Sequence, residues 1–129
     1  MYIKLNWKDA ELQITSTDLE NIINAIEITE KWYSENLENF PPDNMNEIYA
    51  YSSSLKFWKT QTKVEKIEAT VQDISCAILS IQNEVGWATQ SWTDSGPHGI
   101  DFERVKVLSE LKCKLSNFLI WYYNIFTKT

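Results

Sequence analysis

The longest regular pattern in the chain runs from Val64 to Val85. Aliphatic residues recur there at alternating three- and four-residue steps, at Val64, Ile67, Val71, Ile74, Ile78, Ile81 and Val85. In an α-helix this spacing places all seven side chains on one stripe, with the polar residues between them facing water. The positions beside the stripe are mostly small and neutral, which favours a bundle over a two-stranded coiled coil. The pattern predicts one long central helix.

A different period marks the N-terminus, where apolar and polar residues alternate. Ile3, Leu5 and Trp7 alternate with polar residues, and Leu12 and Ile14 do so after a short break. A period of two is typical of a strand with one buried face. Residues 1–16 are therefore predicted to form a β-hairpin, with strands Tyr2–Trp7 and Glu11–Thr15. An isolated hairpin is marginally stable in water, so its apolar face is expected to pack on a helix.

Residues 17–40 are predicted to form the first helix. Thr17 and Glu20 have the spacing of a capping box, and Phe40-Pro41-Pro42 stops the pattern. The expected inner face consists of Leu19, Ile22, Ile23, Ile26, Tyr33 and Leu37. Ile28 and Trp32 are one turn apart and lie off this face, so they need a second covering element or a partner.

Residues 43–85 are predicted to form a kinked or split second helix. Asp43 or Asn44 could cap its start. Its early apolar residues do not share the phase of the later stripe, and weak helix formers separate the two parts. The alternative is that 48–51 and 55–57, which are rich in aromatic residues, form strands.

Gly86 is predicted to end the second helix, and residues 86–100 to form a loop that contains Trp87 and Trp92. Residues 101–126 are predicted to form the last helix, capped by Asp101. Its expected inner face consists of Phe102, Val105, Leu108, Leu115, Leu119, Tyr122 and Phe126. The stretch Phe118–Phe126 is apolar or aromatic nearly all round, so it either lies centrally in a bundle or forms an interface between two copies.

Composition supports one mainly α domain over residues 1–129. The chain has 129 residues, 43% of them hydrophobic, and only three Gly and three Pro. Few turn residues argue against a sandwich or barrel. The predicted fold is an antiparallel helical bundle of three to four helices, with the short N-terminal β-hairpin packed on it.

Charge narrows the classes of partner. The formal net charge is -6, and residues 1–47 hold ten acidic residues against three lysines. Phosphate binding needs clustered Lys and Arg, so neither nucleic acid nor a membrane is an expected partner. A basic protein is the expected partner. The sequence shows no signal peptide and no apolar run long enough to span a membrane, and Cys76 and Cys113 lack the spacing of a disulfide framework, which together predict a cytoplasmic protein.

Candidate catalytic and metal-binding residues are few. His98 is the sole histidine and lies near Asp94, Ser95 and Asp101, but adjacency in a Gly-Pro turn does not bring a nucleophile, base and orienting group together. One His and two distant Cys match no zinc spacing, and the acidic residues lack the spacing of a calcium loop. We expect no enzyme activity, no cofactor and no metal.

The remaining candidates are surfaces for binding a partner protein. Four acidic residues, Glu20, Glu27, Glu35 and Glu38, fall close to the side of the first helix opposite its apolar face. Ile28, Trp32, Trp87 and Trp92 add apolar side chains of the kind that dominate protein interfaces. The plainer interpretations are a solvated helix face and tryptophans that anchor a loop.

These features predict a small acidic interaction protein that inhibits or tethers a basic partner, as immunity proteins, antitoxins and phage anti-defence proteins do. One alternative is a self-associating structural or assembly subunit, such as a homodimer formed through Phe118–Phe126. Another is a small-molecule binder that uses Trp87, Trp92 and His98 in the loop.

Overall fold

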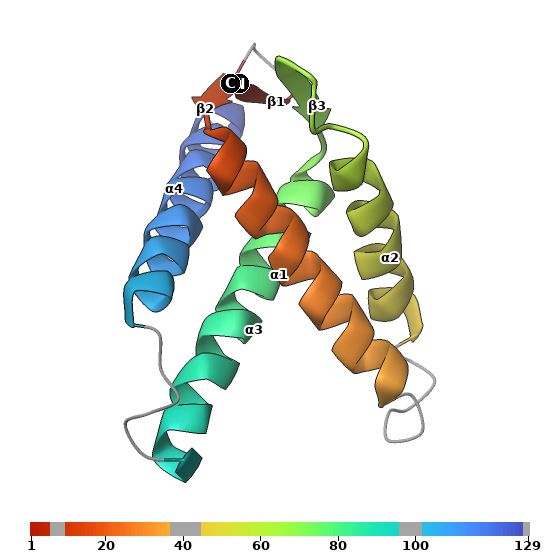
Figure 1. The fold of residues 1–129 in the computed structure, drawn as a ribbon. Coiled ribbons are helices and arrows are strands. Elements are labelled where there is room, and N and C mark those ends of the chain that lie inside the picture. The colour runs from red at the N-terminus through yellow and green to blue at the C-terminus, as the bar shows by residue number, and fades with distance from the viewer. Residues whose placement is uncertain (6–9, 37–44, 96–101, 128–129) are drawn as a thin grey trace.

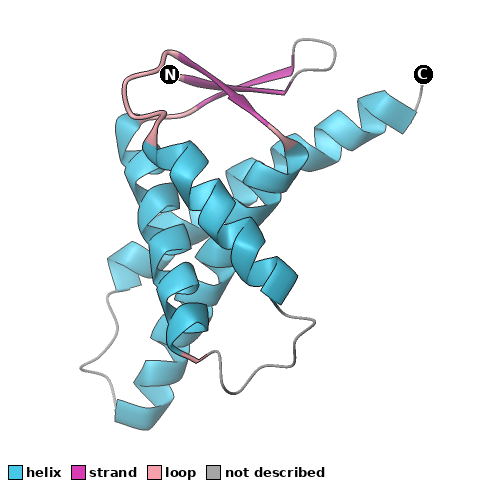
Figure 2. Cartoon of the chain, turned by 90° about the vertical axis from the view of Figure 1, so that its right-hand side faces the viewer, coloured by secondary structure: helices cyan, strands magenta, loops and turns pink. Residues whose placement is uncertain are grey.

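The structure, a computed structural model, describes residues 1–5, 10–36, 45–95 and 102–127. Over these residues the protein is mainly α, with four helices and a small mixed three-stranded sheet (Figure 1). The helices are α1 (Ser16–Glu35), α2 (Met45–Lys59), α3 (Val71–Ser95) and α4 (Phe102–Thr127). The strands are β1 (Tyr2–Leu5), β2 (Ala10–Gln13) and β3 (Lys66–Ala69). The sheet lies across one end of the helices (Figure 2).

The predicted N-terminal hairpin forms two strands of this sheet, but the hairpin is not the whole unit. β1 pairs with β2 in antiparallel fashion, with Ile3 opposite Leu12. On its other side β1 pairs with β3 in parallel, with Ile3 beside Ile67. The inward side chains of all three strands pack into the core, because period-two alternation directs them to the same face of the sheet. Trp7 lies outside the described residues.

The prediction of one continuous helix over Val64–Val85 is wrong in its first part. Lys66–Ala69 is strand β3, and α3 begins only at Val71. Ile67 satisfies both patterns, because it fits the heptad spacing and also alternates with exposed Lys66 and Glu68. A capping box marks the real start of α3. The Thr70 hydroxyl accepts from the Asp73 N–H at 3.1 Å, and the Asp73 carboxylate accepts from the Thr70 N–H at 3.1 Å.

The predicted loop over residues 86–100 is wrong over its first ten residues, because α3 continues to Ser95. Gly86 is therefore a residue of the helix interior and does not end it. A single glycine is tolerated within a helix at a cost of about 1 kcal/mol relative to alanine, which neighbouring helix-compatible residues offset. Residues 96–100 lie outside the described part of the chain.

Helix α1 begins two residues earlier than the predicted capping box. The N-cap is Thr15, whose hydroxyl accepts from the Asp18 N–H at 3.0 Å, while the Asp18 carboxylate accepts from the Thr15 N–H at 3.0 Å. The sequence contains two overlapping cap signals, and the predicted one at Thr17 and Glu20 is not used. The reason is that β2 ends at Gln13, which leaves Thr15 in the extended conformation that an N-cap needs.

Residues 48–57 belong to helix α2, so the alternative of strands there is wrong. The predicted second helix is split, because a turn and strand β3 separate α2 from α3. Trp58 near the end of α2 is fully buried, and its indole Nε1 donates to the Asp73 carbonyl oxygen at 3.3 Å. This bond ties the end of α2 to the first turn of α3.

Helix α3 packs against α1, α2 and α4, and so joins the other helices. The core contains the inward sheet residues and one face of each of α1, α3 and α4. Its fully buried aliphatic members are Ile3, Leu5, Ile22, Ile26, Ile67, Ile74, Ile81, Leu108 and Leu115.

Helix α4 contributes Leu108, Leu115 and Leu119 to the core, as its pattern predicts. Phe102 is not on the inner face as predicted, because its side chain is 66% exposed at the first turn of the helix. The C-terminal end of α4 extends beyond the other helices (Figure 2). Asp101 and the side chain of Phe126 lie outside the described residues.

Candidate functional site

The outward face of α1 carries most of the predicted partner-binding residues. Its inward positions Leu19, Ile22 and Ile26 are buried in the core. Helical periodicity therefore directs the intervening residues to solvent. The exposed residues of this face are Glu20, Asn24, Glu27, Ile28, Lys31, Trp32 and Glu35. Glu38 lies outside the described part of the chain.

Two apolar side chains lie among these polar residues. Ile28 is 42% exposed and Trp32 is 40% exposed. The Trp32 ring contacts Trp87 of α3, with ring centroids 5.5 Å apart and an angle of 37° between the planes. Trp87 is a half-buried residue on a helix, not on a loop as predicted. The fold thus brings Trp32 and Trp87 together from positions 55 residues apart in the sequence.

Trp92 lies on the same helix as Trp87, but its side chain is outside the described part of the structure. The structure therefore joins one of the two predicted loop tryptophans to the α1 face and leaves the other unplaced.

The acidic residues of this face are partly paired. Glu27 lies 3.6 Å from Lys59 of α2, and Glu35 lies 4.0 Å from Lys31 on its own helix. All four side chains are largely exposed, and such pairs contribute at most about 1 kcal/mol each. Within the described ranges Glu20 forms no ion pair. Because the ion pairs of Glu27 and Glu35 are weak, cationic side chains of a partner could replace Lys59 and Lys31 at a small cost in free energy.

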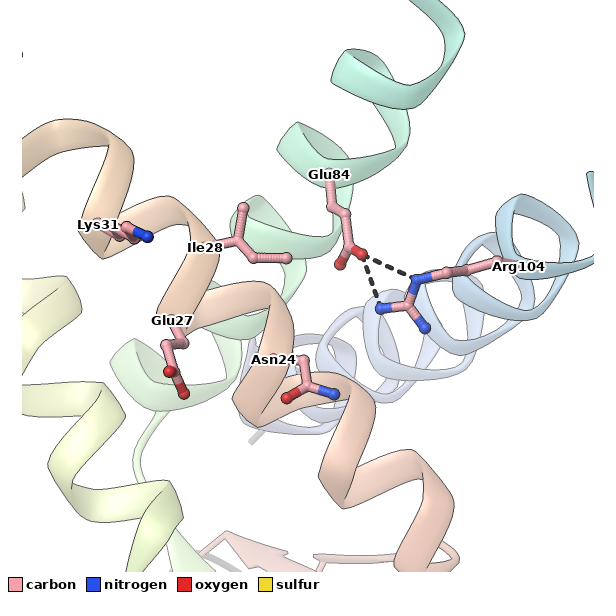
Figure 3. A pocket seen from close by; sticks show the side chains of 6 residues that line it. All are labelled: Asn24, Glu27, Ile28, Lys31, Glu84 and Arg104. Atoms are coloured by element: carbon pink, nitrogen blue, oxygen red, sulfur yellow. Dashed lines mark hydrogen bonds and ion pairs between the residues drawn. The ribbon is translucent and has the colours of Figure 1, made fainter. Parts of the chain in front are cut away.

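A cleft of about 380 Å³ opens between α1, α3 and α4 (Figure 3). It is lined by Asn24, Glu27, Ile28, Lys31, Glu84 and Arg104. Glu27, Ile28 and Lys31 fall on one side of α1 because they are three to seven residues from Asn24. The cleft therefore borders the exposed face that carries Trp32.

An ion pair between α3 and α4 forms one wall of the cleft. Glu84 Oε1 accepts from Arg104 Nη2 at 2.7 Å and from Nε at 3.0 Å. Arg104 Nη1 also donates to Asn21 Oδ1 of α1 at 3.3 Å. The second carboxylate oxygen, Glu84 Oε2, is buried and has no hydrogen-bond partner among the described residues. An unpaired buried oxygen of this kind favours a donor.

Sequence reasoning missed Asn24, Glu84 and Arg104 as site residues. Glu84 lies beside the apolar stripe of Val64–Val85 and Arg104 lies in the predicted last helix, and helical spacing does not relate residues of two different helices. A signal did exist, because Arg104 is the only arginine in the chain. Its planar guanidinium is suited to holding a carboxylate in a fixed orientation.

A second cleft, of about 310 Å³, lies between α1, α2 and α3. Tyr33 and Tyr51 stack there with ring centroids 5.6 Å apart and planes 16° apart. Burial, with Tyr33, Cys76 and Glu47 close by, raises the pKa of Tyr51 to about 12. Burial also raises the pKa of the Cys76 thiol, which keeps this group protonated and unreactive near neutral pH. Its lining is mixed, with Glu47, Asn83 and the two tyrosine hydroxyl groups beside apolar side chains.

The described residues contain no cluster of three or more His, Cys, Asp or Glu side chains that could hold a metal ion. His98 and Asp101 are outside the described part of the chain, so their predicted neighbourhood is not placed. Cys76 is buried, Cys113 is exposed, and both are free.

Of the four helices in the described ranges, none combines the length and the hydropathy that a bilayer crossing requires. Three large side chains near the C-terminal end of α4 are nonetheless exposed. Ile120, Trp121 and Tyr123 are 59%, 49% and 50% exposed.

Comparison with known proteins gives no relative from which a role could be inferred. No protein-family description matches the chain, and neither the curated proteins nor the solved structures include a significant match. The candidate site therefore has to be interpreted from its own geometry and charge.

Proposed function

We propose that this protein binds a basic partner protein through the outward face of α1 and thereby inhibits or tethers it, in the manner of immunity proteins, antitoxins and phage anti-defence proteins. The observation that carries the proposal is the contact between Trp32 and Trp87 beside the carboxylates of α1. Exposed tryptophans are frequent binding hot spots, and carboxylates around them attract a basic surface and fix its orientation.

The balance of charge supports the same partner class. Between Asp18 and Glu35, α1 carries five acidic residues against the single Lys31. A potential of this sign accelerates the approach of a basic protein and repels nucleic acid. The ion pairs with Lys31 and Lys59 weaken the potential locally but do not involve Glu20.

The test compares binding of basic proteins encoded by adjacent genes, after co-expression with this protein. Changing Glu20, Glu27 and Glu35 together to Gln should weaken binding and reduce its dependence on salt. The control changes Glu47, Glu68 and Glu110 to Gln, which alters the net charge equally at exposed positions on other elements. Trp32→Ala should weaken binding at every salt concentration. Equal binding by both triple variants would contradict the proposal.

The second candidate function is self-association through the end of α4. No charged residue occurs from Leu115 to Thr127. Ile120, Trp121 and Tyr123 are exposed and lie outside the face of the helix that buries Leu115. A protein with a net charge of -6 repels its own copies least through an uncharged surface, which favours a second copy over a basic partner at this position.

Sedimentation velocity over a range of protein concentrations separates the two candidates. Self-association predicts a dimer in the wild type that Trp121→Glu disrupts and that the Gln substitutions on α1 leave intact. A wild type that stays monomeric up to high concentration would remove this candidate and leave the first one unaffected.

A further inference from the structure

The unpaired oxygen Glu84 Oε2 marks the cleft beside α1 as an incomplete polar site. Arg104 approaches the Glu84 carboxylate from the α4 side and bonds only Oε1. Figure 3 shows the carboxylate between Ile28 and Arg104. Oε2 is buried without a donor in the part of the chain that the structure describes. Glu84 lines the cleft, so a donor that enters the cleft can reach this carboxylate.

The other walls favour a cation with a long apolar stem. Asn24 contributes a side-chain oxygen from α1, and the exposed Ile28 offers an aliphatic surface beside Glu84. The Glu27 carboxylate, also on α1, is paired with Lys59 of α2. Arg and Lys side chains pack their methylene groups on such surfaces while the charged head reaches polar atoms. An anion is less suited, since the guanidinium of Arg104 already donates to Glu84 and to Asn21.

Two positive groups also line the cleft, and both are compensated. Arg104 is neutralised by Glu84, and Lys31 lies 4.0 Å from Glu35 at the exposed rim. Because Lys31 is long and exposed, it can turn away from the cleft. The surrounding helix surface remains negative, which favours entry of a cation.

We propose that this cleft receives a single arginine side chain of the basic partner, with its guanidinium donating to Glu84 Oε2 and to Asn24 Oδ1. The proposal rests on the proposed function and gives its partner a specific anchor. Arginine fits better than lysine because a planar guanidinium donates in several directions at once, whereas the acceptors lie on different walls of the cleft.

The test is a titration of the whole ¹⁵N-labelled protein, followed by NMR, with three short capped peptides. Their central residue is arginine, lysine or citrulline, the uncharged analogue of arginine. The arginine peptide should shift the amide signals of Asn24, Ile28 and Glu84 in a saturable way. Its affinity should exceed that of the lysine peptide about tenfold, in line with bidentate recognition. The citrulline peptide should bind far more weakly.

The second part of the test uses a variant of this protein whose own guanidinium occupies the cleft. Asn24 is exposed, so Asn24→Arg leaves the core intact and should abolish the response to the arginine peptide. The matched control, Thr62→Arg, changes the net charge equally at an exposed turn outside the cleft and should preserve the response. Equal shifts by arginine and lysine peptides spread along α1, or no shifts at all, would overturn the proposal.

These results are separable from the test of the proposed function. If a basic partner binds through α1 and neither the peptides nor Asn24→Arg have an effect, the arginine site is wrong and the proposed function stands. If the arginine peptide binds in the cleft and no basic partner depends on the α1 carboxylates, the cleft is a cation site and the proposed function is wrong.

Discussion

The buried Tyr51 side chain makes the stability of this fold depend on pH. It packs between α1 and α3, stacked on Tyr33, and its pKa rises from 10.0 to about 12 mainly because burial disfavours the phenolate. The nearby Tyr33, Cys76 and Glu47 act in the same direction. Burial raises the pKa of Tyr33 as well. The interface therefore favours the protonated, neutral form of both tyrosines.

The free energy of unfolding should fall as pH rises from 10 towards 12. The folded state holds the Tyr51 proton more tightly than the unfolded state does, so its stabilising contribution is complete below pH 10 and is lost as pH passes the folded pKa. The loss should reach up to about 2 kcal/mol. Tyr51→Phe should flatten this part of the profile in urea titrations at several pH values. If the free energy of unfolding fell equally with pH in both proteins, the loss could not be assigned to Tyr51.

The cleft could not be found in the sequence because its residues come from three different helices. Glu27, Ile28 and Trp32 stand out on α1 by helical spacing alone. Glu84 and Arg104 are 20 residues apart on different helices, and Asn21 joins them from a third. Only the packing of three helices brings these groups within hydrogen-bond distance.

At the scale of secondary-structure elements, the start of α1 depends on which of two possible capping boxes forms. Thr15 and Thr17 both precede acidic residues at the spacing of a capping box, and the structure uses Thr15. The Asp18 carboxylate also contacts Lys114 Nζ at 3.2 Å, which links the start of α1 to α4.

Thr15→Ala should lower the free energy of unfolding by about 1 kcal/mol, because the Asp18 N–H loses its acceptor. Thr17→Ala is the matched control and should change stability little, since Thr17 is an exposed residue inside the first turn. Chemical denaturation followed by circular dichroism measures both. A larger loss for Thr17→Ala would restore the cap predicted from the sequence.

Gly86 provides a test for α3 in which the substitution should stabilise the protein. It lies inside the helix, and a Cβ added there would meet no atom within 4 Å. Gly86→Ala should therefore raise the free energy of unfolding by roughly 0.5–1 kcal/mol, because alanine loses less conformational entropy in a helix. Thermal unfolding gives the comparison. If the helix ended at Gly86 in a left-handed conformation, the same substitution would destabilise the protein.

At the scale of the whole molecule, β3 joins the N-terminal and central parts of the chain. It pairs in parallel with β1, more than sixty residues away in sequence, and places Ile67 beside Ile3 under the sheet. The Lys66 Nζ to Glu11 Oε1 contact of 3.2 Å lies on the outer face of the same sheet.

Ile67→Ala should lower the free energy of unfolding by about 2–4 kcal/mol, because it empties a fully buried position that contacts both layers. Glu68→Ala, on the exposed face of the same strand, should change it by less than about 0.5 kcal/mol. Urea titration distinguishes them. A small effect of Ile67→Ala would mean that β3 contributes little to the fold, as expected if the segment were the solvated end of a helix.

The sequence by itself determined the helical class, the two N-terminal strands, most of the buried faces of α1 and α4, and the outward position of Ile28 and Trp32. These follow from the period of apolar residues, which is a local property. The tertiary structure decided the parallel partner of β1, the continuation of α3 past Gly86, the contact of Trp32 with Trp87, and the cleft with its unpaired Glu84 oxygen. A segment such as Lys66–Ala69 satisfies two periods at once. Only the free edge of β1, supplied by a distant part of the chain, selects the strand.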